Sequence, residues 1–170
     1  GTDYDALMEL AEQQQIPLPV LVTTAAVAVD AARRDSTEAL VVHAVYNRFG
    51  EPALDVATCL VNSVAQSVRF PAFASVAELV ETVDRGYVKT VRRRWFREEL
   101  YRRIYLTTHR APATEAIALN FLREPCAREL RPFLDGTPVT SDIGPIECRT
   151  VAAVHDEQRR TLDLAIWDSQ

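Results

Sequence analysis

The chain has 170 residues, of which 24 are acidic and 19 basic, so its formal net charge is −5, and 48% of its residues are hydrophobic. This composition is typical of a folded globular protein and excludes an intrinsically disordered chain. The longest apolar run, Pro17 to Val29, is interrupted by Thr23 and Thr24 and is too short to cross a bilayer, and no charged-then-apolar signal peptide opens the sequence. We therefore expect a cytoplasmic protein with a single domain over residues 1–170.

Cysteine and histidine usage indicates neither a disulfide framework nor a metal site. The three cysteines cannot all pair, no two of them form a CxxC motif, and the three histidines lie far apart in the sequence. We expect reduced thiols, no metal and no tightly bound cofactor. The six residues are Cys59, Cys126, Cys148, His43, His109 and His155.

Two helices are predicted at the start of the chain. Apolar residues recur at helical spacing between Tyr4 and Gln14, and Asp3 can cap this segment. After a break at residues 16–19, a second helix is predicted from Pro19 to Arg34. It consists almost wholly of small and apolar residues, so we expect a core helix packed on several sides.

Two strands and a third helix follow. Residues 38–46 and 57–70 are predicted as strands, the second long enough to bend or to carry a bulge. Ser75 and Glu78 have the spacing of a capping box, and Gly86 inside the helix that follows predicts a kink or a close contact. Helix is expected to resume over residues 98–106. The apolar stripe of the third helix consists of Val76, Leu79, Val80, Val83, Tyr87, Val91 and Trp95.

The rest of the chain is predicted to be mostly strand. Residues 116–122 have a strand pattern, residues 123–144 form an irregular stretch, and residues 146–155 and 160–167 alternate as in a β-hairpin. The order is helix, helix, strand, strand, helix, helix, strand, strand, strand. This grouping predicts an α/β (α+β) layered sandwich in which helices flank a mixed sheet, rather than a doubly wound parallel sheet.

Few residues have the pattern of a catalytic site, and the sequence lacks the GxSxG, Walker, GxGxxG and HExxH motifs. His155 and Asp156 are adjacent, but we expect them in a solvated hairpin turn. His43 is expected to be a hydrogen-bonded structural histidine. Cys59 would be a nucleophile beside His43 if their strands paired, although a free cysteine in a strand is usually buried and inert.

Positive charge is concentrated between Arg85 and Arg110. This segment holds nine basic residues against two acidic ones, a balance of +7, which leaves −12 for the rest of a chain whose total is −5. This region is either a solvated face or a binding site for an anionic partner such as phosphate or an acidic protein. Nucleic acid is disfavoured because the chain is acidic overall and no aromatic residues interleave with the arginines. Helical spacing places four of these residues on one side of the third helix: Arg85, Lys89, Arg92 and Arg93.

The order of the motifs carries further information. The helix over residues 20–34 and the strand over residues 40–46 precede Asn47-Arg48, and Val61-Asn62-Ser63 follows in the next strand. Ser75 to Val80 opens the third helix. This series resembles the C-terminal half of condensation domains of nonribosomal peptide synthetases, where a small residue and an arginine precede a G-x-F-V-N-T segment and a helix that begins S-x-x-E-L-L. The strands over residues 118–121 and 162–166 match later strands of that family.

Two departures from the family pattern concern activity. The family has an H-Q-D-x-P-F-E segment after the third helix, where this chain has residues 92–98 with the sequence RRRWFRE. The H-H-x-x-x-D-G active-site motif, which belongs to the family's N-terminal half, is absent from this chain.

The resemblance implies one lobe of a chloramphenicol-acetyltransferase-like fold, in which two lobes enclose a tunnel where an acceptor amine attacks a carrier-bound thioester. This chain would be the C-terminal lobe. Beside its N-terminal lobe it would supply a tunnel wall and a docking surface, with no catalytic residue, so the isolated chain would be inactive. Asn62 would line the tunnel, although an asparagine that bonds the sheet backbone explains it equally. Arg85, Lys89, Arg92 and Arg93 would bind the acidic acceptor carrier protein and the phosphate of its phosphopantetheine.

Two alternatives to an amide-forming domain stay open. A related acyltransferase of the same fold would make esters, and a non-catalytic condensation-like domain would serve as a recruitment platform, which the altered segment over residues 92–98 fits. We further expect the chain, which starts at Gly1, to be a piece of a larger multidomain protein. An isolated lobe would expose an apolar face that favours homo-oligomers.

Overall fold

The structure is a computed structural model that describes residues 2–45, 61–93, 116–123 and 148–168. In these ranges the chain forms three helices and five strands. In chain order they are α1 (Thr2–Gln13), α2 (Leu18–Arg34), β1 (Glu38–Val45), β2 (Asn62–Arg69), α3 (Val76–Val91), β3 (Ala116–Arg123), β4 (Arg149–Asp156) and β5 (Thr161–Trp167).

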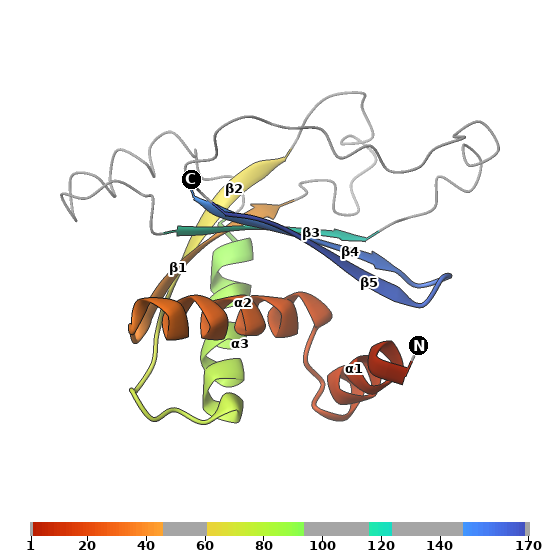
Figure 1. Cartoon of the computed structure of the whole chain (residues 1–170), viewed down its shortest axis with the longest axis horizontal. Coiled ribbons are helices and arrows are strands. Elements are labelled where there is room, and N and C mark those ends of the chain that lie inside the picture. The colour runs from red at the N-terminus through yellow and green to blue at the C-terminus, as the bar shows by residue number, and fades with distance from the viewer. Residues whose placement is uncertain (1, 46–60, 94–115, 124–147, 169–170) are drawn as a thin grey trace.

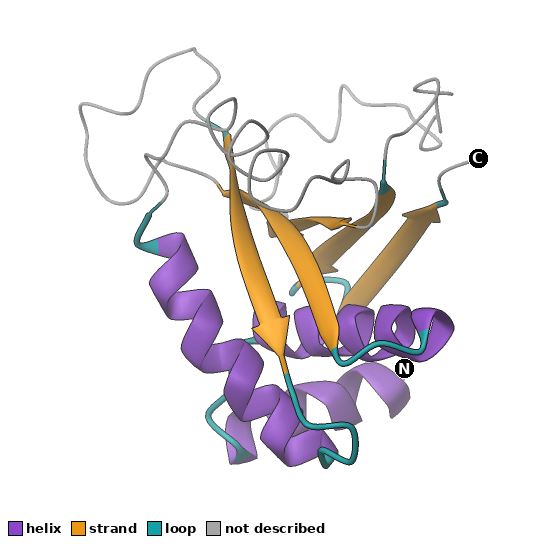
Figure 2. Ribbon diagram, turned by 90° about the vertical axis from the view of Figure 1, so that its left-hand side faces the viewer, coloured by secondary structure: helices purple, strands orange, loops and turns teal. Residues whose placement is uncertain are grey.

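The strands form one five-stranded mixed sheet in the order β2-β1-β3-β4-β5. β1 pairs with β3, and β3 with β4, in parallel, whereas the edge strands β2 and β5 pair antiparallel with β1 and β4. Helices α2 and α3 lie on one face of this sheet (Figures 1 and 2). The predicted layered sandwich of helices and a mixed sheet is therefore confirmed.

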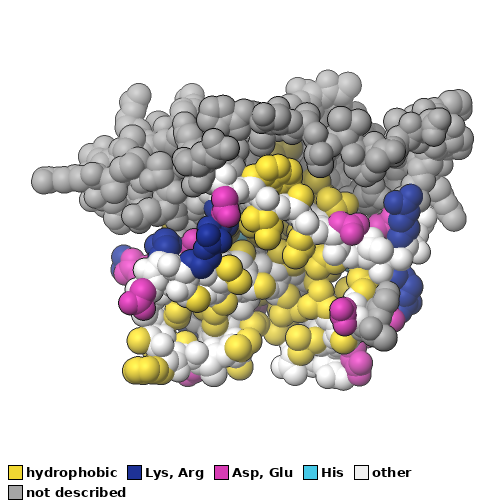
Figure 3. Space-filling model, in the orientation of Figure 1, with side chains coloured by type: hydrophobic (Ala, Val, Ile, Leu, Met, Phe, Trp, Pro, Cys, Tyr) yellow, Lys and Arg dark blue, Asp and Glu magenta, His cyan; other side chains and the backbone are white. Residues whose placement is uncertain are grey.

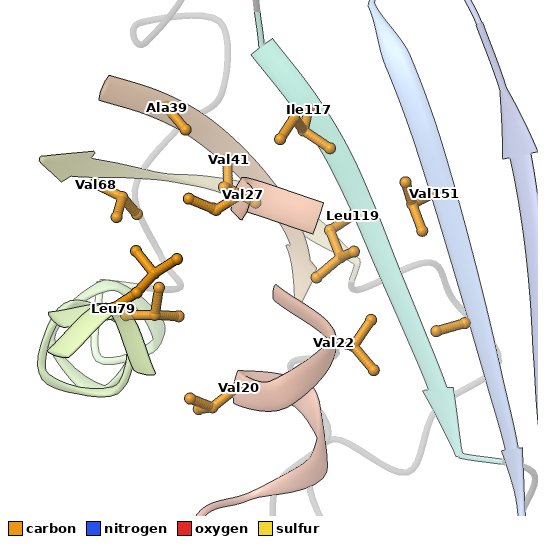
Figure 4. Packing of buried hydrophobic residues seen from close by; sticks show 12 residues of the cluster. Val20, Val22, Val27, Ala39, Val41, Val68, Leu79, Ile117, Leu119 and Val151 are labelled. Atoms are coloured by element: carbon orange, nitrogen blue, oxygen red, sulfur yellow. The ribbon is translucent and has the colours of Figure 1, made fainter. Parts of the chain in front are cut away.

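Aliphatic side chains form the core between the sheet and the two helices. Val20 and Val27 of α2 are fully buried and belong to one cluster with Val41 of β1, Val83 of α3 and Ile117 of β3. Figure 4 shows side chains of α2 and α3 pointing toward those of the strands. Because burial of each aliphatic side chain contributes about 1.5–3 kcal/mol, this cluster holds both helices on the sheet.

Helix α2 packs through one side and leaves another open. The hydroxyl groups of Thr23 and Thr24 in its buried part donate to the carbonyl oxygens of Pro19 (2.7 Å) and Val20 (2.8 Å), so these buried polar groups are satisfied within the helix. Val29, by contrast, is 57% exposed. The prediction of a helix packed on several sides is therefore wrong for the side of α2 that carries Val29. This side faces the open part of the sheet formed by β4 and β5.

The predicted strands and helices are present wherever the structure describes them, although α3 ends earlier and β4 continues further than predicted. β2 is confirmed from Asn62 to Arg69, where it pairs residue for residue with β1 and carries no bulge. The hairpin predicted near the end of the sequence is present as β4 and β5. Residues 57–60, the predicted helix over 98–106 and residues 124–144 of the predicted irregular stretch lie outside the described residues.

In the described ranges, no single helix is long and apolar enough to cross a membrane. Asp3–Gln13 and Leu18–Arg34 meet the length and composition criteria only as a pair, with a bend of 108° between them.

Candidate functional site

Helix α3 carries most of the predicted site, and its start is defined by local hydrogen bonds. Ser75 Oγ accepts from the backbone N–H of Glu78 (3.3 Å), and the Glu78 carboxylate accepts from the backbone N–H of Ser75 (2.8 Å). This is the capping box that the sequence predicts. The bond from the Ser75 backbone, aided by one from its hydroxyl, lowers the pKa of Glu78.

Val76, which follows the cap, is 77% exposed. Of the rest of the predicted apolar stripe, Leu79 and Val83 are buried, whereas Trp95 lies outside the described residues. The other members, Val80, Tyr87 and Val91, are half-buried.

A buried chain of hydrogen bonds connects α3 to the sheet. The Gln66 side chain in β2 donates to the carbonyl oxygen of Val83 in α3 (2.8 Å), and Gln66 Oε1 lies 2.8 Å from His43 Nε2 in β1. Gly86 packs against the same side chain, since a Cβ at position 86 would lie 2.5 Å from Gln66 Nε2. The predicted close contact at Gly86 is therefore confirmed, and it sets how closely α3 approaches β2.

His43 has a structural role in this chain of bonds. It is 3% exposed, and its ring meets that of Tyr87 edge-on, with 5.2 Å between the centroids. Burial lowers the pKa of His43 from 6.5 to about 4, against the smaller opposing effect of its bond to Gln66. The ring is therefore neutral at pH 7, and its Nε2–H donates to the Gln66 oxygen, which can only accept. The interpretation of His43 as a hydrogen-bonded structural residue is confirmed.

The exposed side of α3 carries the predicted basic residues. Arg85, Lys89, Arg92 and Arg93, which we call the basic face, are all exposed. Arg85 Nη2 lies 2.6 Å from Oε1 of Glu81, one turn earlier, in an exposed ion pair that contributes little. In the part of the chain that the structure describes, the other three basic residues pair with no carboxylate.

An apolar side chain lies within the basic face. Val88 is 45% exposed and is three residues after Arg85 and four before Arg92, so the three share one side of α3. The sequence pattern does not reveal this exposed side chain, because Val88 lies beside the buried stripe and looks like part of the core. An exposed apolar side chain with basic residues around it complements a partner protein whose contact surface has an apolar centre and acidic surroundings.

Helix α3 ends before the last residues of the basic face. Its last residue is Val91, Arg92 is the C-cap, and the N–H of Arg93, in the following turn, donates to the carbonyl oxygen of Thr90 (2.9 Å). The prediction that Arg92 and Arg93 lie within the helix is therefore wrong, because the final turn tightens into shorter-range bonds. Arg92 keeps helical backbone angles (φ −62°, ψ −22°) and still extends the row that begins at Arg85.

Asn62, the predicted tunnel residue, is the first residue of β2. It is half-buried and opposite Val45 of β1. β2 and α3 run in opposite directions, so Asn62 and the C-terminal end of α3 lie toward the same end of the molecule (Figure 2). The fold thus brings the two parts of the predicted site to one end, and the tunnel role of Asn62 stays a prediction.

The structure corrects the prediction for His155 and Asp156. Both are buried, with 2% and 4% exposure, because β4 continues through Asp156. The Tyr4 hydroxyl of α1 lies 2.8 Å from His155 Nε2, and Asp156 Oδ1 accepts two backbone N–H bonds from the turn (2.9 and 3.0 Å). The expected solvated turn is wrong because α1, distant in the sequence, packs at this end of the hairpin.

Among the described residues, the remaining candidates give no second site. Within the described ranges, no group of three or more His, Cys, Asp or Glu side chains could hold a metal. β1 and β2 do pair, as the nucleophile hypothesis for Cys59 requires, but Cys59 lies outside the described residues. The basic face therefore offers the chemistry of a binding site for an anionic group, with arginines that can hold phosphate through two bonds.

Known proteins with similar sequences are large synthases. No family model matches the chain. The chain is 62% identical over 168 residues to an isonitrile lipopeptide synthase of Mycobacterium tuberculosis, and 64% identical over 168 residues to one of Mycobacterium marinum. Each match includes 99% of this chain but only 7% and 12%, respectively, of the relative, so the chain spans a small part of these proteins.

Solved structures with a similar fold include condensation domains of two synthetases. The first condensation domain of the CDA synthetase matches 98% of this chain and 37% of its own, with a TM-score of 0.71 and 16% identity. The starter condensation domain of rhizomide synthetase matches 90% of this chain and 36% of its own, with a TM-score of 0.59 and 14% identity. The resemblance drawn from the order of the sequence motifs is therefore confirmed in the fold.

Proposed function

We propose that residues 1–170 form the C-terminal lobe of a condensation domain in a nonribosomal peptide synthetase. The observation that carries this proposal is the 62% and 64% identity of almost the whole chain to two isonitrile lipopeptide synthases. The similarity of the fold to 37% of a condensation-domain chain supports it. The catalytic histidine belongs to the N-terminal lobe, which is the first partner of this one.

The intact domain joins two carrier-bound groups in the cytoplasm. The amine of the acceptor aminoacyl group attacks the carbonyl carbon of the donor thioester. An amide forms as the C–S bond breaks, and the thiolate that leaves on the donor carrier takes up the proton that the amine loses and becomes a thiol. This lobe helps to position the two reactants and takes no part in proton transfer. Positioning alone accounts for much of the rate enhancement of such a step. Asn62 lines the tunnel. The phosphopantetheine arrives on the carrier, so the lobe has no tightly bound cofactor of its own.

The basic face is the docking surface for the acceptor carrier protein. Lys89, Arg92 and Arg93 are exposed and make no ion pair with the other residues described, so they are ready to pair with carboxylates and with the phosphopantetheine phosphate. Arg85 is held only by an exposed pair with Glu81, which costs about 0–1 kcal/mol to exchange. Val88 supplies the apolar centre of this contact.

A titration of the isotope-labelled chain with the phosphopantetheine-loaded acceptor carrier tests this docking role. We expect saturable amide shifts centred on residues 85–93. The shifts should weaken strongly in about 1 M salt, where the screening length falls to about 3 Å. Absence of shifts at high carrier concentration would contradict the docking role and leave the fold unaffected.

Charge reversal provides a matched comparison. The variant Arg92→Glu is expected to weaken carrier binding by about tenfold. Arg123→Glu reverses an exposed arginine at the end of β3, outside the basic face, and is expected to leave carrier binding unchanged. If the parent domain docks the carrier but forms neither amide nor ester, the alternative of a non-catalytic recruitment platform is favoured. If it forms esters, the alternative of a related acyltransferase is favoured.

A further inference from the structure

Apolar side chains gather at one corner of the molecule, where the chain passes from β2 to α3, at the lower left of Figures 1 and 3. Phe73, in this connection, is 99% exposed, and Val76, in the first turn of α3, is also mostly exposed. A single exposed apolar residue is common on protein surfaces, whereas a group of neighbouring ones marks an interaction site. The group, which we call the apolar corner, consists of five exposed residues: Pro71, Ala72, Phe73, Val76 and Ala77.

The backbone of the apolar corner is fixed by hydrogen bonds. The N–H of Ala74 donates to the carbonyl oxygen of Pro71 (3.0 Å), which closes a tight turn with Phe73 in its central part. Before this turn, the N–H of Phe70 donates to the carbonyl oxygen of Thr37 (3.1 Å), and after it the capping box holds the start of α3. Binding through Phe73 therefore orders little backbone, which favours affinity.

Charge distinguishes the apolar corner from the basic face on the same helix. Residues 70–84 include three acidic and no basic residues, whereas residues 85–93 include four basic and no acidic ones. Glu78 and Glu81 are exposed, and Glu81 lies one turn after Ala77 on the same side of α3. The exposed pair of Glu81 with Arg85 lies at the boundary between the two halves. The apolar corner therefore has an acidic margin, whereas Val88 has a basic one.

This charge pattern disfavours two of the partners that the apolar corner could have. An acidic carrier protein is repelled by the acidic margin and attracted by the basic face. A second copy of the chain, related by a two-fold axis through the corner, would bring two acidic margins together. A protein surface with an apolar pocket and a basic rim complements both the apolar residues and the charge.

We propose that the apolar corner docks another domain of the same polypeptide, through an apolar pocket on that domain that has basic residues at its rim. The two lipopeptide synthases match 99% of this chain, while the chain makes up 7% and 12% of them, so these proteins contain much polypeptide beyond the matched region. A connection within one polypeptide raises the effective concentration of the partner, so a small apolar surface is sufficient. The proposal does not depend on carrier docking.

The test uses the M. marinum relative with its matched region replaced by this chain. Ala72→Cys places a thiol beside Phe73, and mass spectrometry of the peptide that contains position 72 measures how fast the thiol reacts with a soluble maleimide. A short peptide with the sequence of residues 69–77 and the same cysteine gives the rate of an unprotected thiol. We expect the thiol to react at least about tenfold more slowly in the synthase than in the peptide, because the docked domain must move away first.

Matched substitutions make the result specific. Phe73 and Val88 are both exposed apolar residues, but Val88 lies in the basic face. In the synthase, Phe73→Ser is expected to restore the fast reaction at position 72, and Val88→Ser is expected to leave the thiol protected. Val41→Cys, at 0% exposure, is the folding control and should stay unreactive.

Reversal of one charge in the acidic margin tests the basic rim of the partner. Glu81→Lys is expected to speed the reaction at position 72, but by less than Phe73→Ser, because charges at the edge of an interface contribute less than a central aromatic residue. A rate that Glu81→Lys leaves unchanged would contradict the basic rim.

Three further results would overturn the proposal. The first is an equal rate at position 72 with and without Phe73→Ser, while Val41→Cys stays unreactive. The second is protection that Val88→Ser also removes, which would assign the apolar corner to the carrier. The third is protection that rises with the concentration of the synthase, which would assign the corner to a second copy. The carrier titration reports on residues 85–93 and this experiment on position 72, so a failure of one is distinguishable from a failure of the other.

Discussion

The two ends of the sheet are completed in different ways. At β2 and β1, helix α3 covers the sheet, and buried bonds run from His43 through Gln66 to the backbone of α3. At β4 and β5, Leu164 and Ile166 are more than half exposed. A buried polar network permits one arrangement, because each member needs its partner, whereas an apolar floor accepts any surface of complementary shape. The first end therefore specifies its own structure, whereas the second leaves apolar side chains of the sheet exposed.

Among the variants at the first end, the largest effect is expected from Gln66→Leu. This change leaves His43 Nε2 buried without its partner, at a cost of about 1–3 kcal/mol, whereas the Val83 carbonyl loses only its second bond and keeps the one within α3. We expect the free energy of unfolding in urea at pH 7 to fall by about 1–3 kcal/mol. Ser67→Leu, at the exposed neighbouring position of β2, is the control and should change it by less than about 0.5 kcal/mol. Similar values for the two variants would contradict the network's role.

Acid is expected to weaken the same end. The pKa of His43 is about 4 in the folded protein, against an ordinary value of 6.5, which we take for the unfolded chain. Above pH 6.5 the His43 ring is therefore neutral in both states, and the free energy of unfolding does not depend on it. As the pH falls from 6.5 toward 4, only the unfolded chain gains the proton, and stability is lost. Between pH 6.5 and 5 the loss is about 2 kcal/mol, since one pKa unit is worth about 1.4 kcal/mol.

Urea denaturation at pH 7, 6 and 5 measures this loss. Burial raises the pKa of Tyr87, the ring packed on His43, so it stays neutral throughout this range. In the variant His43→Leu, the free energy of unfolding should lose the part of its pH dependence that is due to His43. If the pH dependence is the same in this variant as in the unchanged chain, another group causes the acid sensitivity.

Gly86→Ala tests the contact between α3 and β2. Alanine favours a helix by about 1 kcal/mol, but its Cβ would lie 2.5 Å from Gln66 Nε2, which belongs to a side-chain amide fixed by two hydrogen bonds. Overpacking of this kind costs about 1–3 kcal/mol, so we expect a net loss of about 1 kcal/mol in the free energy of unfolding. With Gln66→Ala already present, the same change should stabilise the protein. Identical effects in both backgrounds would show that the contact is not limiting.

The smallest effect is expected from Ile166→Ser at the second end. Ile166 is 61% exposed in this chain, so the free energy of unfolding should change by less than about 0.5 kcal/mol. Ile117→Ser on β3, at 1% exposure, is the buried counterpart and should cost at least about 3 kcal/mol. A loss at Ile166 as large as that at Ile117 would mean that the face of β5 is already covered.

Features decided by nearby residues could be predicted from the sequence. The capping box of Ser75 and Glu78 depends on residues three positions apart, and the alternating pattern of β1 reflects one strand alone. The burial of His155 could not be predicted, because it depends on Tyr4, 151 positions earlier. No local pattern contains that contact.

The candidate site shows the same division. Helical spacing was sufficient to place Arg85 and Lys89 on one side of α3, whereas the C-cap at Arg92 depends on how the last turn closes. The role of Gln66 was visible only through the glycine at position 86, which indicated that something approaches the helix closely. The exposed side of α2 that carries Val29 looks like core in the sequence. A composition of small and apolar residues does not reveal which sides of a helix are covered in the fold.

The parallel pairings at the centre of the sheet have a consequence for synthesis on the ribosome. On one side β1 pairs with β2, the next strand along the chain. On its other side β1 pairs with β3, which brings Leu40 opposite Ala116. Closing so long a loop costs entropy that only later contacts recover, so pairings of this kind form late. The unit of α2, β1, β2 and α3 emerges first with much of its own core, and the free edge of β1 stays open until β3 arrives. We therefore expect the docking of β3 to be the slow step of folding and the stage at which the nascent chain is most prone to aggregate.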